Sequence, residues 1–363
     1  MEIWVPYGNV ESLVTLQAEN IGELIDPTPE SQADELLHRL GEQINGQDGV
    51  VVCDYKPATM KLFRLLAPQL PQDGTVKVYS PFAKHLEDAV PELKGRVMKL
   101  SPPSAPLQGD GELKVPPELT EGSKFVLSTG EPDPLFGYVD SRVALARSCI
   151  PGANRLAFGA SKGDEPRFME ETKSYGIMAS VTDGLRNATY ATVIAKGGEP
   201  YSMIEGGPEE AKAHYSPLQL APSKGIIVGA GGLGYDDTFS HSLRLVLAAL
   251  KGLRKGGEMV IVAECREGIG SDALQMYAMG RINEAMMRRG FYAEGMEEIS
   301  YLEALKQQNS VTLISSLPEL YSGGRFRFRA SRSSAEAMEK VFATVGRTAK
   351  LHIITRSPEI LLN

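Results

Sequence analysis

Short apolar runs recur along the chain and alternate with segments that have helical periodicity. The clearest runs are GVVVCD (49–54), KFVLSTG (124–130), GIIVGAGG (225–232), GGEMVIVAE (256–264) and SVTLISS (310–316). Strands that are apolar along their whole length are typical of parallel sheets with helices on both faces. The alternation therefore predicts an α/β fold with mainly parallel sheets.

The length of the chain predicts two domains, because 363 residues exceed what one hydrophobic core normally supports. The stretch PEEAKAHYSPLQLAPSKG (208–225) contains three prolines and is the best linker candidate. We therefore expect an N-terminal α/β domain over 1–208 and a C-terminal α/β domain over 209–363.

Charge and hydropathy exclude several classes of partner. A net charge of −8 argues against nucleic-acid binding, which needs a basic surface. The one basic run, GGRFRFRASRS (323–333), is interpreted as an edge strand with a solvated face. No apolar run approaches the roughly 20 residues that span a bilayer, and the first residues do not form a targeting signal. A soluble, cytoplasmic protein that binds no membrane is expected.

The cysteines give no sign of a disulfide framework or a metal site. Cys53, Cys149 and Cys265 are far apart in the sequence and form no C-x-x-C pair. Each is expected to be a small buried hydrophobic residue, and no metal ligand is predicted.

The stretch GAGGLG (229–234) matches the dinucleotide-binding pattern G-x-G-x-x-G letter by letter. The segment DDTFSHSLRLVLAALKGLRK (236–255) follows it and predicts one amphipathic helix. Asp236 or Asp237 is expected to cap this helix. Cations are expected in its last turn, where the helix dipole favours them: Lys251, Arg254 and Lys255.

The surroundings of this loop argue against a dinucleotide. Such a site needs an acidic residue about 20 positions after the loop to hold the ribose hydroxyls. Glu264 ends the next strand but lies about 30 positions away, which is late for that role. Asp236 and Asp237 would also place negative charge where a pyrophosphate binds. A tight glycine turn into a capped helix is therefore favoured over an NAD(P) or FAD loop.

Several segments resemble the nickel-pincer lactate racemase family. The stretch from Gly231 to Gly270 is the most specific, because it is similar to a signature of paired glycines, an aspartate, a long helix, a second glycine pair, a strand and a G-x-G ending. The resemblance covers nearly the whole chain and is strongest after about Gly206. The other similar segments are VPYGNVESLVTL, IGELIDP, GGPEEAKAHY and AMEKVFATVGRTAKLHII.

The resemblance implies two α/β domains with an interdomain cleft. In active members this cleft binds a nickel-pincer nucleotide and a small 2-hydroxy acid, whose α-hydrogen leaves as a hydride and returns to either face. Two histidines act as acid and base, a lysine anchors the cofactor, and a further histidine helps to bind nickel. A small anion, either a hydroxy acid or a nucleotide, is therefore the expected partner, and no oligomeric state is predicted.

Several positions depart from the family pattern. Asp54-Tyr55-Lys56-Pro57 stands where the family has Asp-His-Thr-Arg-Pro, so Asp54 matches and Lys56 replaces the arginine as a cation. His85 lies near the family's Gly-x-His loop but better matches the start of the next helix. Arg147 takes the place of the anchoring lysine, and its guanidinium is a poor nucleophile. Covalent attachment of the nickel-pincer nucleotide is therefore not expected, and the cofactor is unknown.

The chain has five histidines, and none matches a catalytic or nickel-binding position of the family. His38 and His214 are expected on exposed helical segments, and His352 within a strand. His241 is the catalytic candidate, because it lies in the signature segment one turn before Arg244. The predicted substrate- or cofactor-binding residues are Asp54, Lys56, Arg147, Gly231, Gly232, Asp236 and Arg244.

Three hypotheses for function follow. The first is a divergent isomerase of small 2-hydroxy acids, and the second is a non-catalytic relative that binds a small acid or a nucleotide. The third, a nicotinamide dehydrogenase, ranks lowest. Structural roles compete with the functional ones, because Asp54 and Asp236 could cap helices and Arg147 could pair with Asp140 or with a neighbouring domain.

Overall fold

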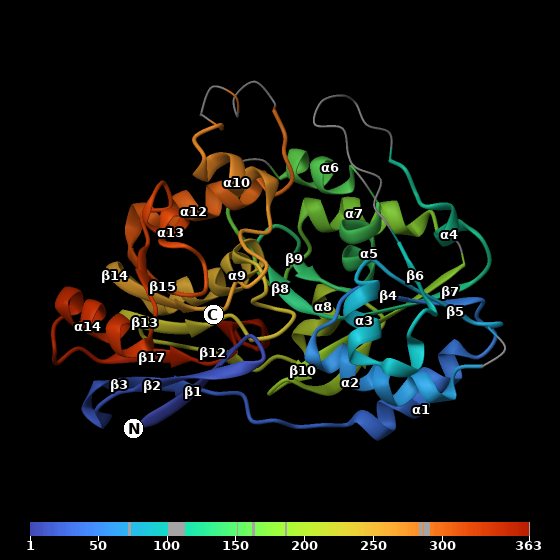
Figure 1. Ribbon diagram of the computed structural model, residues 1–363, viewed down its shortest axis with the longest axis horizontal. Helices are drawn as coiled ribbons and strands as arrows, with labels where there is room; N and C mark the ends of the chain where they lie inside the picture. Colours follow the sequence, from blue (N-terminus) through green and yellow to red (C-terminus); the bar gives the residue numbers. More distant parts are fainter. Residues whose placement is uncertain are drawn as a thin grey trace. The chain divides into compact units, whose positions relative to one another are not determined.

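The chain forms two compact units (Figure 1). Unit 1 comprises Met1–Pro27 and Ser216–Asn363, and unit 2 comprises Thr28–Tyr215. The observed division after Tyr215 lies near the expected boundary at 208, whereas the N-terminal segment belongs with the C-terminal part of the chain. The structure is a computed structural model that describes residues 1–71, 74–100, 113–150, 152–161, 164–185, 187–282, 286 and 291–362.

Unit 2 is built on a six-stranded sheet of order β11-β10-β7-β4-β5-β6. All its neighbouring strands are parallel except β10 and β11, which are antiparallel. The strands are β4 (Gly49–Val52), β5 (Lys77–Ser80), β6 (Val97–Lys99), β7 (Lys124–Thr129), β10 (Ala188–Lys196) and β11 (Glu199–Ile204). A short hairpin adds β8 (Glu131–Asp133) and β9 (Gly137–Val139).

Helices cover both faces of this sheet. They are α1 (Ala33–Ile44), α2 (Pro57–Leu66), α3 (Ala83–Ala89), α4 (Pro117–Thr120), α5 (Ser141–Cys149), α6 (Ala153–Ala160), α7 (Lys173–Asp183) and α8 (Pro208–Lys212), with 3-10 turns η2 (Ala67–Gln69) and η3 (Pro91–Leu93).

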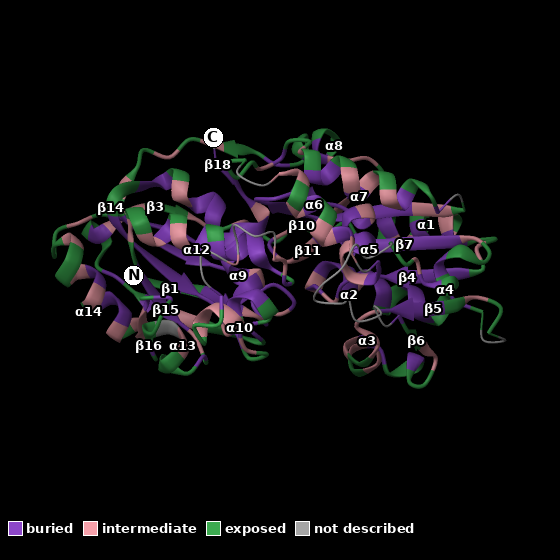
Figure 2. Ribbon diagram, turned by 90° about the horizontal axis from the view of Figure 1, so that it is seen from above, coloured by how far each residue is buried: buried purple, intermediate pink, exposed green. Residues whose placement is uncertain are grey.

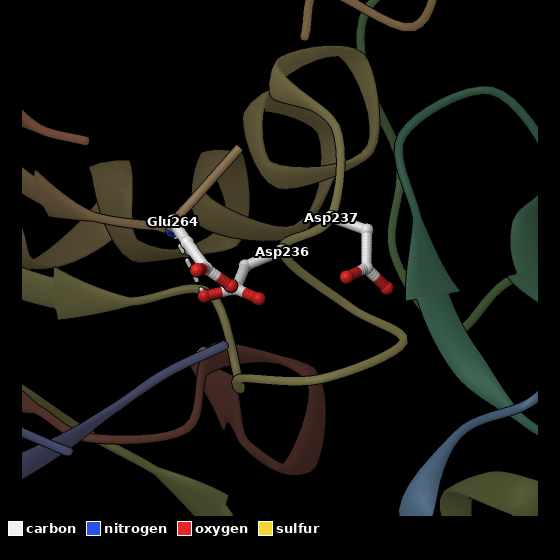
Figure 3. A group of neighbouring side chains, drawn as sticks. All are labelled: Asp236, Asp237 and Glu264. Carbon is white, nitrogen blue, oxygen red and sulfur yellow. Dashed lines mark hydrogen bonds between the residues drawn. The ribbon is translucent and has the colours of Figure 1, made fainter. Parts of the chain in front are cut away.

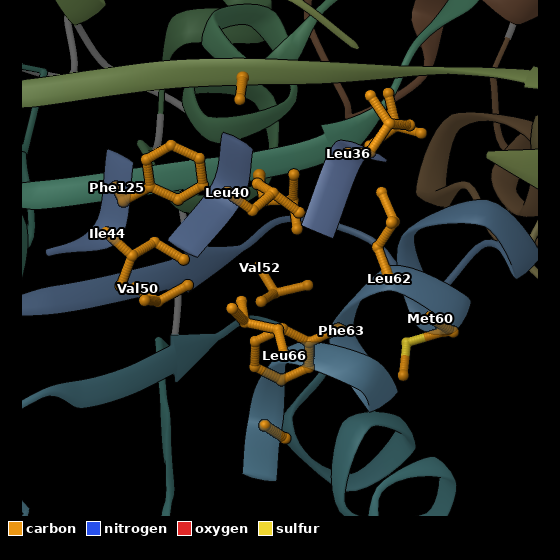
Figure 4. Close-up of a cluster of buried hydrophobic side chains, with 14 of the residues drawn as sticks. Leu36, Leu40, Ile44, Val50, Val52, Met60, Leu62, Phe63, Leu66 and Phe125 are labelled. Atoms are coloured by element: carbon orange, nitrogen blue, oxygen red, sulfur yellow. The ribbon is translucent and has the colours of Figure 1, made fainter. Parts of the chain in front are cut away.

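Strand β4 shows why its sequence is apolar throughout. Val50 and Val52 point to the core under α1 and α2 (Figure 4), and Val51 and Cys53 point to the core under α5 and α7. Successive side chains of a strand alternate between faces, so a strand covered on both faces needs apolar residues at every position. The expected α/β class with mainly parallel sheets is confirmed in this unit.

Unit 1 contains a second six-stranded sheet, which is parallel throughout and has the order β16-β15-β14-β13-β17-β3. The strands are β3 (Ile21–Ile25), β13 (Ser223–Gly229), β14 (Leu253–Val262), β15 (Ser310–Ile314), β16 (Arg329–Ser331) and β17 (Leu351–Ile354). The other strands are β1 (Glu2–Tyr7) paired with β2 (Val10–Thr15), and β12 (Pro217–Leu218) paired with β18 (Leu361–Leu362).

The helices of unit 1 are α9 (Phe239–Val246), α10 (Asp272–Ala278), α12 (Met296–Gln308), α13 (Glu319–Gly323) and α14 (Ser334–Val345), with 3-10 turns η1 (Ala18–Asn20), η4 (Leu247–Gly252) and η5 (Ser357–Glu359). The sheet strands are largely buried (Figure 2). None of these helices, nor any other in the described part of the chain, is long and apolar enough to cross a membrane.

The N-terminal segment belongs to unit 1 because it completes that unit's sheet and core. Strand β3 pairs with β17 at one edge of the sheet. Ile3, Val5, Val14 and Leu16 of the β1–β2 hairpin join the buried cluster that also contains strand β13 and helix α14. The expectation of an edge strand in the basic run 323–333 is confirmed for β16, which ends the sheet on the other side.

A topological switch point is a place where two neighbouring parallel strands connect onward in opposite directions. In unit 2 this point lies between β4, which connects onward to β5, and β7, which connects onward to β10. In unit 1 the neighbours β13 and β17 are also not consecutive in the chain, and their carboxyl ends lie side by side, but β17 is the last strand of that sheet. Open α/β sheets bind ligands outside the carboxyl ends of the strands at such points. A ligand-binding site is therefore expected at the loops that follow β4, β7, β13 and β17.

Candidate functional site

Asp54 follows β4 directly and joins the two strands of the unit 2 switch point. Its Oδ2 accepts a hydrogen bond from the amide of Thr129 at the end of β7 (2.6 Å), and its Oδ1 accepts from the amide of Lys56 (3.2 Å). Burial raises the pKa of Asp54, while Lys56 and these amides oppose the rise. The geometry gives Asp54 a structural role as a tie between two loops.

Lys56 precedes α2 and is 4% exposed. Its Nζ lies 2.7 Å from Oε2 of Glu131, donates to the carbonyl of Thr129 (3.0 Å) and lies 3.9 Å from Asp54 Oδ2. A cation held this closely by buried oxygens has little capacity left for a ligand. The positive charge of Lys56, which was predicted to bind an anion, is thus balanced by carboxylates of unit 2.

Glu131, which supplies the counter-charge for Lys56, is not among the residues predicted from the sequence. Glu131 is the first residue of β8, lies two residues after the end of β7, and is 3% exposed. A carboxylate directly after an apolar strand is a signal that a polar partner lies at the same edge of the sheet. That partner cannot be named from the sequence, because Lys56 comes from a different loop.

Tyr55 and His85 lie side by side at the carboxyl ends of β4 and β5. Their rings stack with centroids 4.2 Å apart, and Phe82 meets Tyr55 edge-on at 5.0 Å. His85 sits in the first turn of α3, as the sequence predicts. This stacked pair is a second feature of the edge that sequence analysis did not identify.

Arg147 lies in the last turn of α5 and is half-buried. Ser141, in the first turn, contacts Ser128 of β7, so Arg147 lies roughly 9 Å farther along the helix axis. Within the described residues Arg147 and Asp140 form no ion pair; Asp140 instead caps α5 and accepts from Tyr175 Oη (2.7 Å). The alternative pairing is therefore wrong.

The glycine loop of unit 1, Gly229–Gly234, lies at the carboxyl end of β13. Gly231, Gly232 and Gly234 have φ angles of 114°, 82° and 77°, a region that side chains with a Cβ avoid. Its amides bind acceptors of this chain: Leu233 donates to the carbonyl of Gly8 (2.9 Å) and Gly234 to Asp237 Oδ2 (2.8 Å). These donors are not turned outward to cradle phosphates, which agrees with the tight-turn interpretation.

The expected helix after this loop is shorter and capped differently. Helix α9 ends at Val246, η4 follows, and β14 already begins at Leu253, so Arg254 and Lys255 lie in a strand rather than in a last helical turn. Thr238 is the N-cap, and its Oγ1 accepts from the amide of His241 (3.3 Å). The prediction that Asp236 or Asp237 caps the helix is wrong, because both carboxylates bind other groups.

Asp236, Asp237 and Glu264 form a carboxylate cluster at this edge, with one oxygen of each within 4.8 Å of the others (Figure 3). Asp236 Oδ2 accepts from the amides of Gly8 (2.9 Å) and Glu264 (3.0 Å). Asp237 Oδ1 lies 2.7 Å from Nε of Arg266. Three of the six carboxylate oxygens are therefore engaged by this chain, counting Asp237 Oδ2 on Gly234, and we assign no metal to the cluster.

Tyr7 lies beside this cluster. Burial, with Cys265, Glu264 and Asp236, raises the pKa of Tyr7 to about 12, so its hydroxyl stays protonated at neutral pH.

Arg244, predicted to bind substrate or cofactor, is 1% exposed and points to α12. Its Nη1 lies 3.7 Å from Glu297 Oε1 and 3.8 Å from Glu298 Oε1. Both carboxylates are also buried, so this group joins two helices within the core of unit 1. His241, one turn earlier, is half-buried, and its ring centroid lies 6.4 Å from that of Tyr235.

Of the other histidines, His38 and His214 are exposed, as expected. His352 lies in β17, where its Nδ1 accepts from the amide of Glu23 (3.1 Å) and its Nε2 lies 2.7 Å from the carbonyl of Ala221. A histidine with both nitrogens bonded to the backbone is structural. His241 and His85 are thus the histidines placed near the carboxyl ends of the sheets.

No family model matches the sequence, and no curated protein matches it. Among solved structures, the lactate racemase apoprotein from Thermoanaerobacterium thermosaccharolyticum matches with a TM-score of 0.75 and 16% identity over 100% of both chains. This chain has a lactate racemase-like fold. A structural genomics protein from Thermotoga maritima matches with a TM-score of 0.61 and 14% identity over 93% of this chain and 99% of that one. At these identities the likeness concerns the fold alone.

The residues at the positions that the resemblance indicates do not fit a covalently held nickel-pincer nucleotide. The place of the anchoring lysine holds Arg147, whose permanently protonated guanidinium cannot form that bond. Within the described residues, the one group of His, Cys, Asp and Glu side chains with metal-ligand spacing is all carboxylate. Hard oxygen ligands such as these carboxylates suit magnesium or calcium better than they suit nickel, which the pincer would hold through sulfur.

Proposed function

We propose that this chain binds a small 2-hydroxy acid, or a chemically similar carboxylate, in its lactate racemase-like fold without a covalently attached nickel-pincer nucleotide. The observation that carries the proposal is the likeness to the lactate racemase apoprotein over the full length of both chains. The placement of polar residues beyond the carboxyl ends of the strands in each sheet supports it, because open α/β sheets bind ligands at that edge.

Arg356 is the cation that we assign to the carboxylate of the ligand. It follows β17, which pairs with β13 in the unit 1 sheet, is half-buried, and donates through Nη1 to the carbonyl of Gly231 (3.3 Å). Lys56 and Arg244 are balanced by buried glutamates, whereas Arg356 forms no ion pair with an acid in the described part of the chain. A guanidinium binds a carboxylate with two parallel hydrogen bonds.

The bound acid is either isomerised or held without turnover, and the placement of the histidines favours a binding protein without turnover. Acid–base catalysis on both faces of a substrate carbon needs two groups that titrate near neutrality. In unit 1 only His241 lies near the carboxyl ends of the sheet, within the residues that the structure describes, because His352 is bonded to the backbone. An isomerase without the pincer would also need another hydride acceptor.

Ligand binding is tested by thermal shift and calorimetry with D-lactate, L-lactate and related 2-hydroxy acids. We expect saturable stabilisation, and at least a tenfold loss of affinity in Arg356→Gln. Arg332→Gln, which changes an exposed arginine of the same unit, is the matched control and should bind as the wild type does. The absence of any response to these acids in the wild type would contradict the proposal.

The state of the cofactor is tested by intact-mass and nickel analysis of protein made together with the pincer-synthesis enzymes. We expect the mass of the unmodified chain and no stoichiometric nickel. A covalent adduct would show that our interpretation of Arg147 is wrong. Conversion of L-lactate to D-lactate by the purified protein would favour the isomerase over the binding protein.

A further inference from the structure

Two buried carboxylate oxygens at the carboxyl edge of the unit 1 sheet lack a hydrogen-bond donor. They are Asp236 Oδ1 and Glu264 Oε2, neither of which has a partner in the part of the chain that the structure describes. Asp236 is fully buried, and the carboxyl groups of Asp236 and Glu264 lie close together (Figure 3). Two unprotonated carboxylates in this arrangement would repel each other and leave both oxygens unsatisfied.

A single proton resolves both problems. Asp236 is the better site for the negative charge, because its Oδ2 already accepts two amide hydrogen bonds, from Gly8 and Glu264. Glu264 is then the acid, and its hydroxyl becomes a donor for Asp236 Oδ1. We propose that Asp236 and Glu264 hold one proton between them, and that this shared proton locks the Tyr7–Gly8 turn, the glycine loop and the end of β14 together.

The packing around Gly8 brings the carboxyl group of Glu264 against the same turn that Asp236 binds. A Cβ built on Gly8 would lie 1.7 Å from Glu264 Oε2, so this oxygen rests directly on the Gly8 backbone. The amide of Gly8 is held by Asp236, and its carbonyl accepts from Leu233 of the glycine loop. If both carboxyl groups were charged, their repulsion would therefore act on the contacts that join the Tyr7–Gly8 turn, the glycine loop and the end of β14.

The charged and titratable groups around the pair do not remove the need for the proton. Tyr7 of β1 and Cys265 are protonated at neutral pH, since burial raises the pKa of each. Asp237 adds negative charge, and the exposed Arg266, which offsets part of it, is already paired with Asp237. Burial raises the pKa of Glu264 above the usual 4.5, and the negative charge of Asp236 is the next largest cause of the rise.

The direction of the pH effect follows from this rise. The folded protein binds the proton of Glu264 more tightly than the unfolded chain does, so the contribution to stability is complete below pH 4.5 and is lost as the pH rises through the folded-state pKa. Removing the proton should loosen the glycine loop at the edge where the ligand is proposed to bind.

Thermal unfolding of the full chain between pH 5 and pH 8 tests the shared proton. We expect the Tm of the wild type to fall by about 3 °C or more over this range relative to Glu264→Gln and Glu264→Ala, whose side chains carry no charge. At pH 5, Glu264→Gln should match the wild type, because its amide can donate to Asp236. Glu264→Ala should be less stable there, because it leaves that oxygen without a donor.

Glu339→Gln, which changes an exposed glutamate of α14, is the matched control and should keep the pH dependence of the wild type. Infrared spectroscopy gives a direct readout: at pH 6 the carbonyl band of protonated carboxylic acids should be stronger in the wild type than in Glu264→Gln. An unchanged pH dependence in Glu264→Gln, or no such difference in the band, overturns the proposal. Stabilisation of the wild type by Mg²⁺ or Ca²⁺ that Glu264→Gln lacks would also overturn it, because a cation would then take the place of the proton.

Discussion

At the scale of the residue, the buried charges of this protein are balanced mostly by its own side chains. Lys56 lies between Glu131 and Asp54 in unit 2, and Arg244 lies against two glutamates in unit 1. The resemblance to the lactate racemase family predicts that both cations bind a ligand, whereas in the structure each of them lies against glutamates of this chain. Half-buried cations at the sheet edge, such as Arg356, are therefore better ligand-binding candidates than fully buried ones.

Replacing Lys56 tests how much the buried pair contributes to stability. Lys56→Met should lower the free energy of unfolding by about 3–5 kcal/mol, because it leaves buried carboxylates without a counter-charge. Lys61→Met is the matched control: Lys61 pairs with Glu199 where both side chains are partly exposed, and its loss should cost about 0–1 kcal/mol.

Urea unfolding of the full chain, with each variant followed by fluorescence, gives both values. The double variant Lys56→Met/Glu131→Gln should recover part of the loss, since it removes one uncompensated charge. Equal small costs for Lys56→Met and Lys61→Met would show that the buried pair is not a structural unit.

At the scale of the element, the segment 236–255 shows how side-chain hydrogen bonds decide the residue at which a helix begins. Its apolar spacing predicts one long helix from the aspartates onward, yet α9 begins only at Phe239 and β14 begins at Leu253. Asp236 binds the amide of Gly8 in the turn after β1, and Asp237 binds the amide of Gly234 in the glycine loop, so neither is available as a cap. Thr238 is the next residue able to accept an amide hydrogen bond, and the helix starts after it.

Removing this cap should destabilise α9. Thr238→Ala should cost about 1 kcal/mol of stability, because the amide of His241 loses its side-chain acceptor. Thr238→Ser keeps a hydroxyl at the same place and serves as the control, with a cost of a few tenths of a kcal/mol. Chemical denaturation measures both, and a Thr238→Ala variant as stable as the serine variant would contradict this assignment of the cap.

At the scale of the whole molecule, the two units are built differently along the chain. Unit 2 is continuous, whereas unit 1 joins the first 27 residues to residues 216–363. The N-terminal segment supplies an edge strand and four buried side chains to the core of unit 1. A boundary drawn only at the proline-containing stretch near 208–225 separates parts that fold together.

Fragments test this organisation. Residues 28–215 expressed alone should unfold cooperatively, because their sheet and both helical layers come from one continuous segment. Residues 216–363 alone should not, since burial of the sheet face under the hairpin is lost. Fusing residues 1–27 to the end of 216–363 through a flexible linker should restore cooperative unfolding. Circular dichroism with urea titration reads out each case, and cooperative unfolding of 216–363 alone would contradict the prediction.

The sequence by itself determined the α/β class, the parallel strands and the tight glycine turn. These features are local, because strand burial on both faces is encoded by continuous apolar runs such as 49–52 and positive φ angles are encoded by glycines. Only the tertiary structure decided the partners of Lys56, Asp236 and Arg244 and the place of the first 27 residues. Those depend on which distant segments meet at a sheet edge, and no spacing along the chain specifies that.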